Sequence, residues 1–312
     1  MRGVRNTERG IEVVDVADPE PTDDQVVVHV QSSSICGSDL HLIEYGPIPY
    51  VLGHEFAGLL DDGRAVAVDP SQPCGTCDQC TTGARHLCRT GSQRARGISA
   101  DGGMADAIAV DRSSLVALPD GLPPATACLV EPLGVATHAV RIAGLTGGER
   151  VAVVGGGGIG LAAVAAAGPT TDAVGLVARH DSQRDAGERL GAVPAEGEYD
   201  VVLECAGTAS ALETAADLCA PGALVVFLST HWTPVPIPGL PALMKELGFR
   251  WSYTYGTHEH GTDLDDAAAL LASDPTIADT LITNRFPLDD AAEAFRVAGD
   301  RAAGAIKVTL EP

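Results

Sequence analysis

The sequence is poor in positive charge. Its 312 residues include 20 lysines and arginines against 42 aspartates and glutamates, and only Lys245 and Lys307 are lysines. The formal net charge of −22 repels the phosphate backbone of a nucleic acid, which argues against nucleic acid as a partner. We expect a strongly hydrated acidic surface, as in halophilic proteins or in proteins that use Arg in place of Lys.

Signals for export and membrane insertion are also missing. No apolar stretch follows the charges of the N-terminal MRGVRNTERG, so we expect no secretory signal peptide. Residues 151–168 (VAVVGGGGIGLAAVAAAG) have about the length of a membrane span, but four consecutive glycines interrupt them. A strand, a glycine turn and a buried helix explain this segment better. We therefore expect a cytoplasmic protein with no membrane partner.

The cysteines are unevenly distributed. Four of the eight lie between residues 74 and 88, and the other four are scattered. Such clustering favours a metal in a reducing compartment over a disulfide framework.

Two patterns divide the chain, whose length favours two domains. Up to about residue 127, short β-type runs alternate with Gly, Pro and Asp turns, which is typical of a mainly antiparallel, barrel-like domain. From residue 134, apolar strands alternate with helices, as in a doubly wound parallel sheet. The expected elements are β-type runs at 25–30, 64–68 and 105–110; strands at 150–154, 173–177, 200–204 and 223–228; helices at 135–143, 159–167, 182–190 and 209–218; and a final helix and strand at 288–298 and 305–310.

A glycine-rich turn, residues 155–160 (GGGGIG), follows the expected strand 150–154. It fits G-x-G-x-x-G, in which the first glycine makes a tight turn, the second lets the backbone approach a pyrophosphate, and the last lets the helix pack closely. Free amides at the helix start would hold the phosphates. The expected coenzyme-binding residues of this turn are Gly155, Gly157, Gly158, Ile159 and Gly160.

The end of the following strand distinguishes the two nicotinamide coenzymes. An acid there would bond the ribose of NAD, but Ala178 stands at that place and Arg179 follows it. Arg184 lies about one helical turn further on. This favours NADP over NAD, with Arg179 and Arg184 near the extra phosphate. The alternative is a surface Arg179, with Asp181 bonding the ribose.

The clustered cysteines have the spacing C-x2-C-x2-C-x7-C. Four thiolates at such spacing can close a tetrahedron around a structural zinc ion. Iron–sulfur runs also begin C-x2-C-x2-C but continue x3-C-P, whereas here seven residues intervene and Arg89 follows. We expect structural zinc on Cys74, Cys77, Cys80 and Cys88.

Three further segments carry ligand-type residues: 36–41 (CGSDLH), 53–55 (GHE) and 131–132 (EP). In this order, and with the cysteine loop and the glycine turn, they resemble the zinc-dependent medium-chain alcohol dehydrogenases, on the branch with sorbitol, threonine and glucose dehydrogenases. The resemblance covers essentially the whole chain. It implies a GroES-like catalytic zinc domain at 1–133 and 282–312 and a Rossmann dinucleotide-binding domain at 134–281.

The resemblance also implies roles for individual residues. Cys36 and His54 match the two constant ligands of the catalytic zinc and Glu131 the third, while Glu55 can coordinate the metal or lie behind it. Ser38 and His41 match a relay that carries the alcohol proton to solvent while hydride passes to the nicotinamide. Ser252 resembles part of the segment that runs under the nicotinamide.

Some features depart from the family pattern. The loops at 53–68 and between 88 and 101 are short, and His231 with Trp232 is unexpected. We consider Tyr45, Tyr50, Trp232 and Trp251 as substrate-pocket candidates, although core packing would explain each equally well.

We therefore expect an NAD(P)-linked zinc alcohol dehydrogenase that acts on a secondary alcohol, polyol or similar hydroxylated metabolite, as a homodimer or homotetramer. Two alternatives stay open. One is an NADPH-dependent biosynthetic reductase of an activated double bond or iminium, and the other is a non-catalytic, zinc-stabilised family member.

Overall fold

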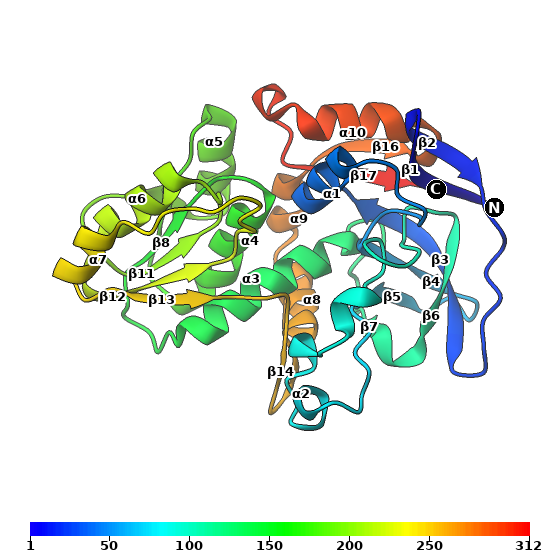
Figure 1. Ribbon diagram of the computed structural model, residues 1–312, viewed down its shortest axis with the longest axis horizontal. Coiled ribbons are helices and arrows are strands. Elements are labelled where there is room, and N and C mark those ends of the chain that lie inside the picture. Colours follow the sequence, from blue (N-terminus) through cyan, green and yellow to red (C-terminus); the bar gives the residue numbers. More distant parts are fainter. The chain divides into compact units, whose positions relative to one another are not determined.

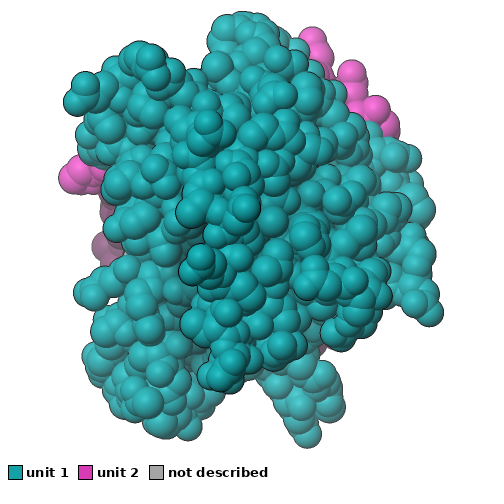
Figure 2. All heavy atoms as spheres, turned by 90° about the vertical axis from the view of Figure 1, so that its right-hand side faces the viewer, with its two compact units in different colours: residues 1–131, 256–312 teal, residues 132–255 magenta. Residues whose placement is uncertain are grey.

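The computed structural model describes residues 1–312, apart from the side chains of Ser92 and Arg301. Contacts within the chain divide it into two compact units, which Figure 2 colours separately: residues 1–131 with 256–312 (unit 1) and residues 132–255 (unit 2). Among the helices described, none combines the length and the apolar character that a membrane span requires.

Unit 1 is built on a seven-stranded sheet. The strand order is β16-β17-β3-β4-β5-β7, and β6 also pairs with β3. The pairs described are antiparallel except for β16 with β17. The strands are β3 (Gln25–Ser34), β4 (Glu55–Leu60), β5 (Ala65–Val68), β6 (Ala107–Asp111), β7 (Leu115–Ala117), β16 (Ile282–Pro287) and β17 (Lys307–Glu311).

Smaller elements complete unit 1. Thr262 caps α8 reciprocally, since its hydroxyl accepts the Asp265 N–H and the Asp265 carboxylate accepts the Thr262 N–H. The elements are β1 (Arg2–Thr7), β2 (Gly10–Asp15), β14 (Thr257–His258), β15 (Gly261–Thr262), α1 (Gly37–Leu42), α2 (Asp78–Thr81), α8 (Asp263–Ser273), α9 (Pro275–Leu281), α10 (Ala291–Gly299), and 3-10 turns at Ile43–Tyr45, Arg85–Leu87, Gly91–Gln93, Arg112–Ser114, Ala127–Leu129, Leu288–Asp290 and Arg301–Ala303.

Two apolar clusters are described among the residues of unit 1. Inward-facing residues of the sheet form one of them, including Val28, Val30 and Phe56. The other lies under α10, which runs along β16 and β17 in Figure 1 and buries Ala294 and Phe295 against β17. The expected barrel-like part is therefore confirmed, because alternate residues of its strands bury one apolar face.

Unit 2 is a six-stranded parallel sheet with the order β10-β9-β8-β11-β12-β13. The chain starts at β8, moves outward to β9 and β10, and then crosses to β11, β12 and β13. The order therefore reverses between β8 and β11, where ligands of doubly wound sheets bind. The strands are β8 (Val151–Val154), β9 (Val174–Val177), β10 (Ala192–Pro194), β11 (Tyr199–Glu204), β12 (Cys219–Phe227) and β13 (Gly248–Trp251).

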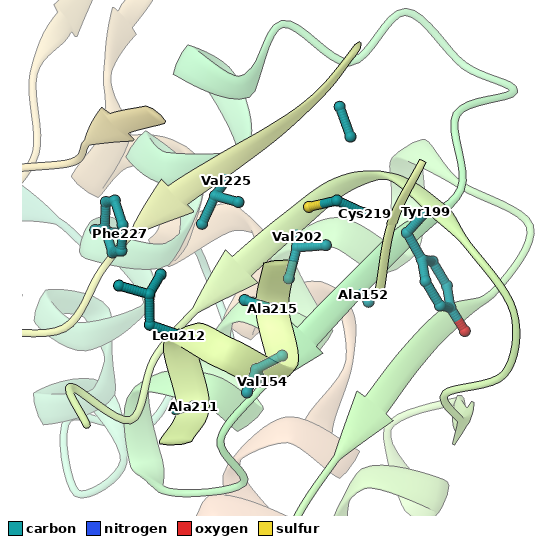
Figure 3. Packing of buried hydrophobic residues seen from close by; sticks show 11 residues of the cluster. Ala152, Val154, Tyr199, Val202, Ala211, Leu212, Ala215, Cys219, Val225 and Phe227 are labelled. Carbon is teal, nitrogen blue, oxygen red and sulfur yellow. The ribbon is translucent and has the colours of Figure 1, made fainter. Parts of the chain in front are cut away.

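Helices connect these strands and cover the sheet. Figure 3 shows Leu212 and Ala215 of α6 packed with Val202, Val225 and Phe227 of the sheet. The Lys245 ammonium donates to the last carbonyls of α6, which completes the C-terminal cap of that helix. The helices are α3 (Val130–Ala143), α4 (Gly158–Ala167), α5 (Asp181–Arg189), α6 (Ala209–Leu218) and α7 (Gly239–Met244), with a 3-10 turn at Gly168–Thr170.

The expected α/β class with a doubly wound sheet is confirmed, and α6 has the predicted bounds. No element was predicted at β1, β10, β13, β16, α7, α8 or α9. Residues 256–281 were expected in the dinucleotide-binding domain, whereas their contacts group them with unit 1. The reason is tertiary: α8 packs on β7 and α9 on β16, both elements of unit 1.

Candidate functional site

Strand pairing in unit 1 brings three ligand-type side chains together. β3 and β4 pair with Ser34 opposite Glu55, so that Cys36, two residues beyond the strand end, lies beside His54. The ligand atoms of Cys36, His54 and Glu55 all lie within 4.8 Å of one another. A thiolate, an imidazole and a carboxylate form a donor set that suits zinc.

A buried carboxylate orients the imidazole of this group. Asp39 Oδ1 lies 3.3 Å from His54 Nδ1, while Asp39 Oδ2 accepts the backbone N–H of Cys36 at 2.9 Å. Burial alone would lower the pKa of His54, but the Asp39 carboxylate and the Cys36 thiolate raise it well above its usual value. A carboxylate behind one ring nitrogen is typical of metal-binding histidines and leaves Nε2 for the metal. The residues present therefore fit a metal ion.

Glu55 is tied to two neighbours. The Lys307 ammonium lies 2.6 Å from Glu55 Oε2 and also bonds Oε1, and the Ser34 hydroxyl donates to Oε2. Both charged side chains are buried, and the Glu55 carboxylate raises the pKa of Lys307 above its usual value even though burial acts in the opposite direction. Glu55 can therefore bind a metal only through carboxylate lone pairs that are not engaged by Lys307 and Ser34.

Glu131 is buried in the first turn of α3 but does not belong to the group of three. Burial raises the pKa of its carboxyl to about 7, and the negative charge of Glu55 acts in the same direction, while His54 and Lys307 oppose it. The structure thus places a carboxyl of raised pKa within electrostatic reach of the predicted metal ligands.

Both predicted relay residues lie on α1. Ser38 Oγ is 3.3 Å from His54 Nε2, which places its hydroxyl at the ligand group. His41 lies one turn further, where its Nδ1 is 3.9 Å from Glu44 Oε2 and its side chain is 36% exposed. The helix therefore carries one hydroxyl at the ligand group and one imidazole in contact with solvent.

The four clustered cysteines converge as predicted by their spacing. Their sulfur atoms all lie within 4.8 Å of one another. The Cys74 N–H points at Cys88 Sγ, at 3.2 Å, and the Cys77 N–H at Cys74 Sγ, at 3.3 Å. Hydrogen bonds from Thr76 and Cys77 lower the pKa of Cys74 to about 5, which favours the thiolate form that a metal requires.

A third group of His258, Asp263 and Asp266 also meets within 4.8 Å, in unit 1. His258 Nδ1 accepts the His260 N–H at 3.3 Å, so Nε2 carries the ring hydrogen and faces Asp266 Oδ2 at 3.1 Å. In this tautomer Nε2 has no lone pair left for a metal.

The glycine turn of unit 2 has the shape of a phosphate cradle. Gly155 has φ +116°, and a Cβ at Gly160 would lie 1.7 Å from the carbonyl oxygen of Gly155. A Cβ at Gly157 would meet nothing within 4 Å, and no side chain caps the ten-residue helix α4 that starts there. The turn thus leaves open space in front of unpartnered helix amides, which suits a pyrophosphate.

Polar residues surround the end of β9. Arg179 is exposed, and no side-chain partner is found for it in the described chain. Arg184 is engaged: it donates to the Ala178 carbonyl at 2.8 Å and pairs with Asp181. Of these two arginines, only Arg179 has a guanidinium whose N–H groups are all available to a ligand at this end of β9.

The remaining predicted residues lie in separate places. Ser252 follows β13, and its buried hydroxyl has no hydrogen-bond partner. Tyr45 and Tyr50 are exposed in unit 1, whereas Trp232 and Trp251 belong to unit 2. Trp251 stacks on Phe227 with ring centroids 4.7 Å apart, which is a packing role.

Sequence reasoning missed the partners of the ligands. Asp39 had a local signal, since it lies three residues after Cys36 at the start of a short helix. Lys307 had a weaker sequence signal: it is one of only two lysines in the chain and lies in a largely apolar strand. Nothing local links Lys307 to Glu55, because 252 positions separate them.

Comparison with known proteins agrees with this geometry. A family model described as "Alcohol dehydrogenase GroES-like domain" matches residues 22–120, and one described as "Zinc-binding dehydrogenase" matches residues 134–272. The D-xylulose reductase of Scheffersomyces stipitis is 30% identical, over 88% of each chain. The L-threonine 3-dehydrogenase of Bacillus licheniformis is 29% identical, over 92% of this chain and 91% of its own.

Solved structures resemble the whole chain. A protein from Sinorhizobium meliloti described as a zinc-binding dehydrogenase, bound to NADP, is 32% identical with a TM-score of 0.88, covering 100% of this chain and 99% of its own. Galactitol-1-phosphate dehydrogenase from Escherichia coli is 28% identical with a TM-score of 0.89, covering 100% of both chains.

Proposed function

The chain belongs to the zinc-dependent medium-chain alcohol dehydrogenase family, and we propose that it interconverts a secondary alcohol of a polyol or similar metabolite and its ketone, with NADP(H) as coenzyme. The observation that carries the proposal is the meeting of Cys36, His54 and Glu55 with Asp39 behind the imidazole. Relatives named for xylulose, threonine and galactitol 1-phosphate support a hydroxylated substrate with a secondary alcohol.

We propose that Cys36, His54 and Glu131 hold the catalytic zinc and that Glu55 takes part when substrate or water exchanges. The ion pair of Glu55 with Lys307 supports this division, because it competes with coordination. When bound, the zinc supplies Lewis acidity at the substrate oxygen, and the nicotinamide accepts or donates the hydride.

The residues of α1 move the proton. Ser38 Oγ accepts it beside the ligand group. His41 then takes it at a ring nitrogen and releases it to solvent, which its partial exposure permits. Asp39 holds His54 in one orientation throughout.

The cysteine loop would hold a second, structural zinc on Cys74, Cys77, Cys80 and Cys88. The N–H···S bonds within the loop support thiolate ligands. All eight cysteines are free, which suits a reducing compartment such as the cytoplasm.

We further propose that the chain forms a homodimer through β13 and α7, or a homotetramer of two such dimers. β13 is the edge strand of the parallel sheet. The helix before it, α7, has three apolar side chains that are 70–75% exposed: Leu240, Leu243 and Met244. An open sheet edge next to exposed apolar residues is typical of an interaction surface. Light scattering of the wild type and of Leu243→Glu tests this, since only the variant should be monomeric.

The coenzyme is tested first by titration of the purified, zinc-loaded protein with NADPH and NADH, following nicotinamide fluorescence. We expect tighter binding of NADPH, and loss of that preference in Arg179→Ala but not in Arg189→Ala, an exposed arginine at the other end of α5. Preference of the wild type for NADH would overturn the role of Arg179. Binding of neither coenzyme would contradict the enzymatic function itself. A panel of polyols and secondary alcohols with NADP⁺ then identifies the substrate.

A further inference from the structure

A cluster of polar side chains lies at the carboxyl edge of the unit 2 sheet, and none of its members has a role in the proposed function. Glu204 is the last residue of β11, and Ser229 and His231 follow β12. The Glu204 carboxylate is fully buried: its Oε1 accepts the N–H groups of Ala206 and Gly207, both at 2.8 Å, and its Oε2 accepts the Ser229 hydroxyl.

These bonds determine the tautomer of His231. Because the Ser229 hydroxyl donates to Glu204, its oxygen can only accept from the imidazole, whose Nε2 lies 3.3 Å away. Glu204 Oε2 is a second acceptor, 3.7 Å from the same nitrogen. Nε2 therefore carries the hydrogen. The opposite nitrogen, Nδ1, is an acceptor in the neutral ring, and no partner for it is found among the described residues.

This direction of bonding excludes a hydrolytic role. A nucleophilic serine donates its hydrogen to the histidine, whereas Ser229 donates to the carboxylate and accepts from the ring. The cluster is built to hold an imidazole.

Packing fixes the ring from a second side. The His231 ring meets Phe227 edge-on, with centroids 5.4 Å apart, and Phe227 is itself buried and stacked on Trp251. The side chain of His231 remains 19% exposed. An immobilised, partly exposed imidazole with a free acceptor is prepared for a ligand that donates a hydrogen bond.

The position of His231, just beyond the carboxyl end of β12, indicates which ligand it contacts. β11 and β12 lie across the switch point from β9, whose end carries Arg179. A dinucleotide in a doubly wound sheet straddles this point, with one nucleoside on each half. Since the adenosine half belongs to the β9 side, the other half falls on the side of His231.

We propose that His231 is a coenzyme-binding residue whose Nδ1 accepts a hydrogen bond from the nicotinamide riboside half of the dinucleotide. This inference rests on the proposed dinucleotide-binding function. The donor is a ribose hydroxyl or the carboxamide N–H.

The test is the binding of NADPH and of 2′-phospho-ADP, which lacks both the nicotinamide and its ribose, to the zinc-loaded protein by calorimetry. His231→Phe keeps a ring against Phe227 but removes the acceptor, so we expect NADPH to bind about 3- to 10-fold more weakly and 2′-phospho-ADP to bind as in the wild type. His231→Asn restores an acceptor near Nδ1 and should recover part of the loss. His260→Phe, an exposed histidine of unit 1, is the matched control.

The inference would be overturned if His231→Phe weakened the binding of both ligands equally, or weakened the binding of neither. Failure of the wild type to bind either ligand would instead overturn the proposed function, and the inference with it. The reduced 3-acetylpyridine analogue of NADP, which lacks the carboxamide N–H, separates the two donors. If His231→Phe weakens this analogue as much as NADPH, the donor is a ribose hydroxyl; if the variant binds it as the wild type does, the donor is the carboxamide.

Discussion

Lys307 and Glu55, 252 positions apart in the sequence, form a buried ion pair behind the predicted ligands Cys36 and His54, with Lys307 Nζ 2.6 Å from Glu55 Oε2. The pairs β3–β4 and β3–β17 of one sheet bring the two residues together. Two opposite charges without water are stable only as a pair, so each residue accounts for the presence of the other.

Removal of one partner of this pair should be costly. We expect Lys307→Met to lower the free energy of unfolding by about 3–5 kcal/mol, because Glu55 is left charged and buried. Urea unfolding at neutral pH measures the loss. The double variant Lys307→Met/Glu55→Gln should recover much of it. A double variant as unstable as the single one would show that packing, and not charge, explains the loss.

Two glycines of the dinucleotide turn should respond differently to substitution by alanine. Gly157→Ala places a methyl group in open space, so stability should change by less than about 0.5 kcal/mol while NADPH binding weakens at least about tenfold. Gly160→Ala collides with the Gly155 carbonyl and should destabilise the fold itself. Thermal unfolding and fluorescence titration separate the two effects. Unchanged NADPH binding in Gly157→Ala would contradict a pyrophosphate at this turn.

The raised pKa of Glu131 predicts a pH dependence of the metal-free protein. The carboxyl has a pKa of about 7 in the folded state against an ordinary value of 4.5, so the fold binds more protons than the unfolded chain between these values. Stability should therefore fall as the pH rises from 4.5 to 7. Urea midpoints measured with a chelator present should show this fall in the wild type and less of it in Glu131→Gln. An equal fall in both proteins would assign it to other groups.

Metal analysis checks the two proposed zinc sites. We expect two zinc ions per chain in the wild type and one in Cys88→Ser, which should also loosen the cysteine loop and increase its cleavage by proteases. Cys205→Ser, at the end of β11, is the control and should retain both ions. If the wild type holds a single zinc ion, one of the two sites is wrong. Loss of that ion in Cys88→Ser would place it in the cysteine loop, and its retention would place it at the other site.

The acidic surface predicts a salt requirement. With a formal net charge of −22, self-repulsion opposes the compact state, and dissolved salt screens it. The urea midpoint should rise between low salt and about 1 M NaCl, where the Debye length is about 3 Å. Sucrose at matched osmolality is the control for general exclusion effects. A midpoint independent of salt would mean that the acidic residues are too dispersed to destabilise the fold.

Local patterns of the sequence were sufficient to predict the two-part α/β architecture, the glycine turn, the cysteine loop and helix α6. Each depends on residues a few positions apart: the alternation that makes a strand, the period that makes a helix, or the spacing that lets four thiolates converge. The ligand types at Cys36 and His54 were likewise evident once their segments were considered together.

Only the tertiary structure decided which side chains meet. Lys307 with Glu55, Asp39 with His54, and Glu204 with Ser229 and His231 are partners because sheet register and helix position bring them within reach. The same holds for α8 and α9, whose place in unit 1 depends on β7 and β16. Local composition determines the elements, but pairing between distant elements determines the environment of each functional group, because burial and charge act through space and not along the chain.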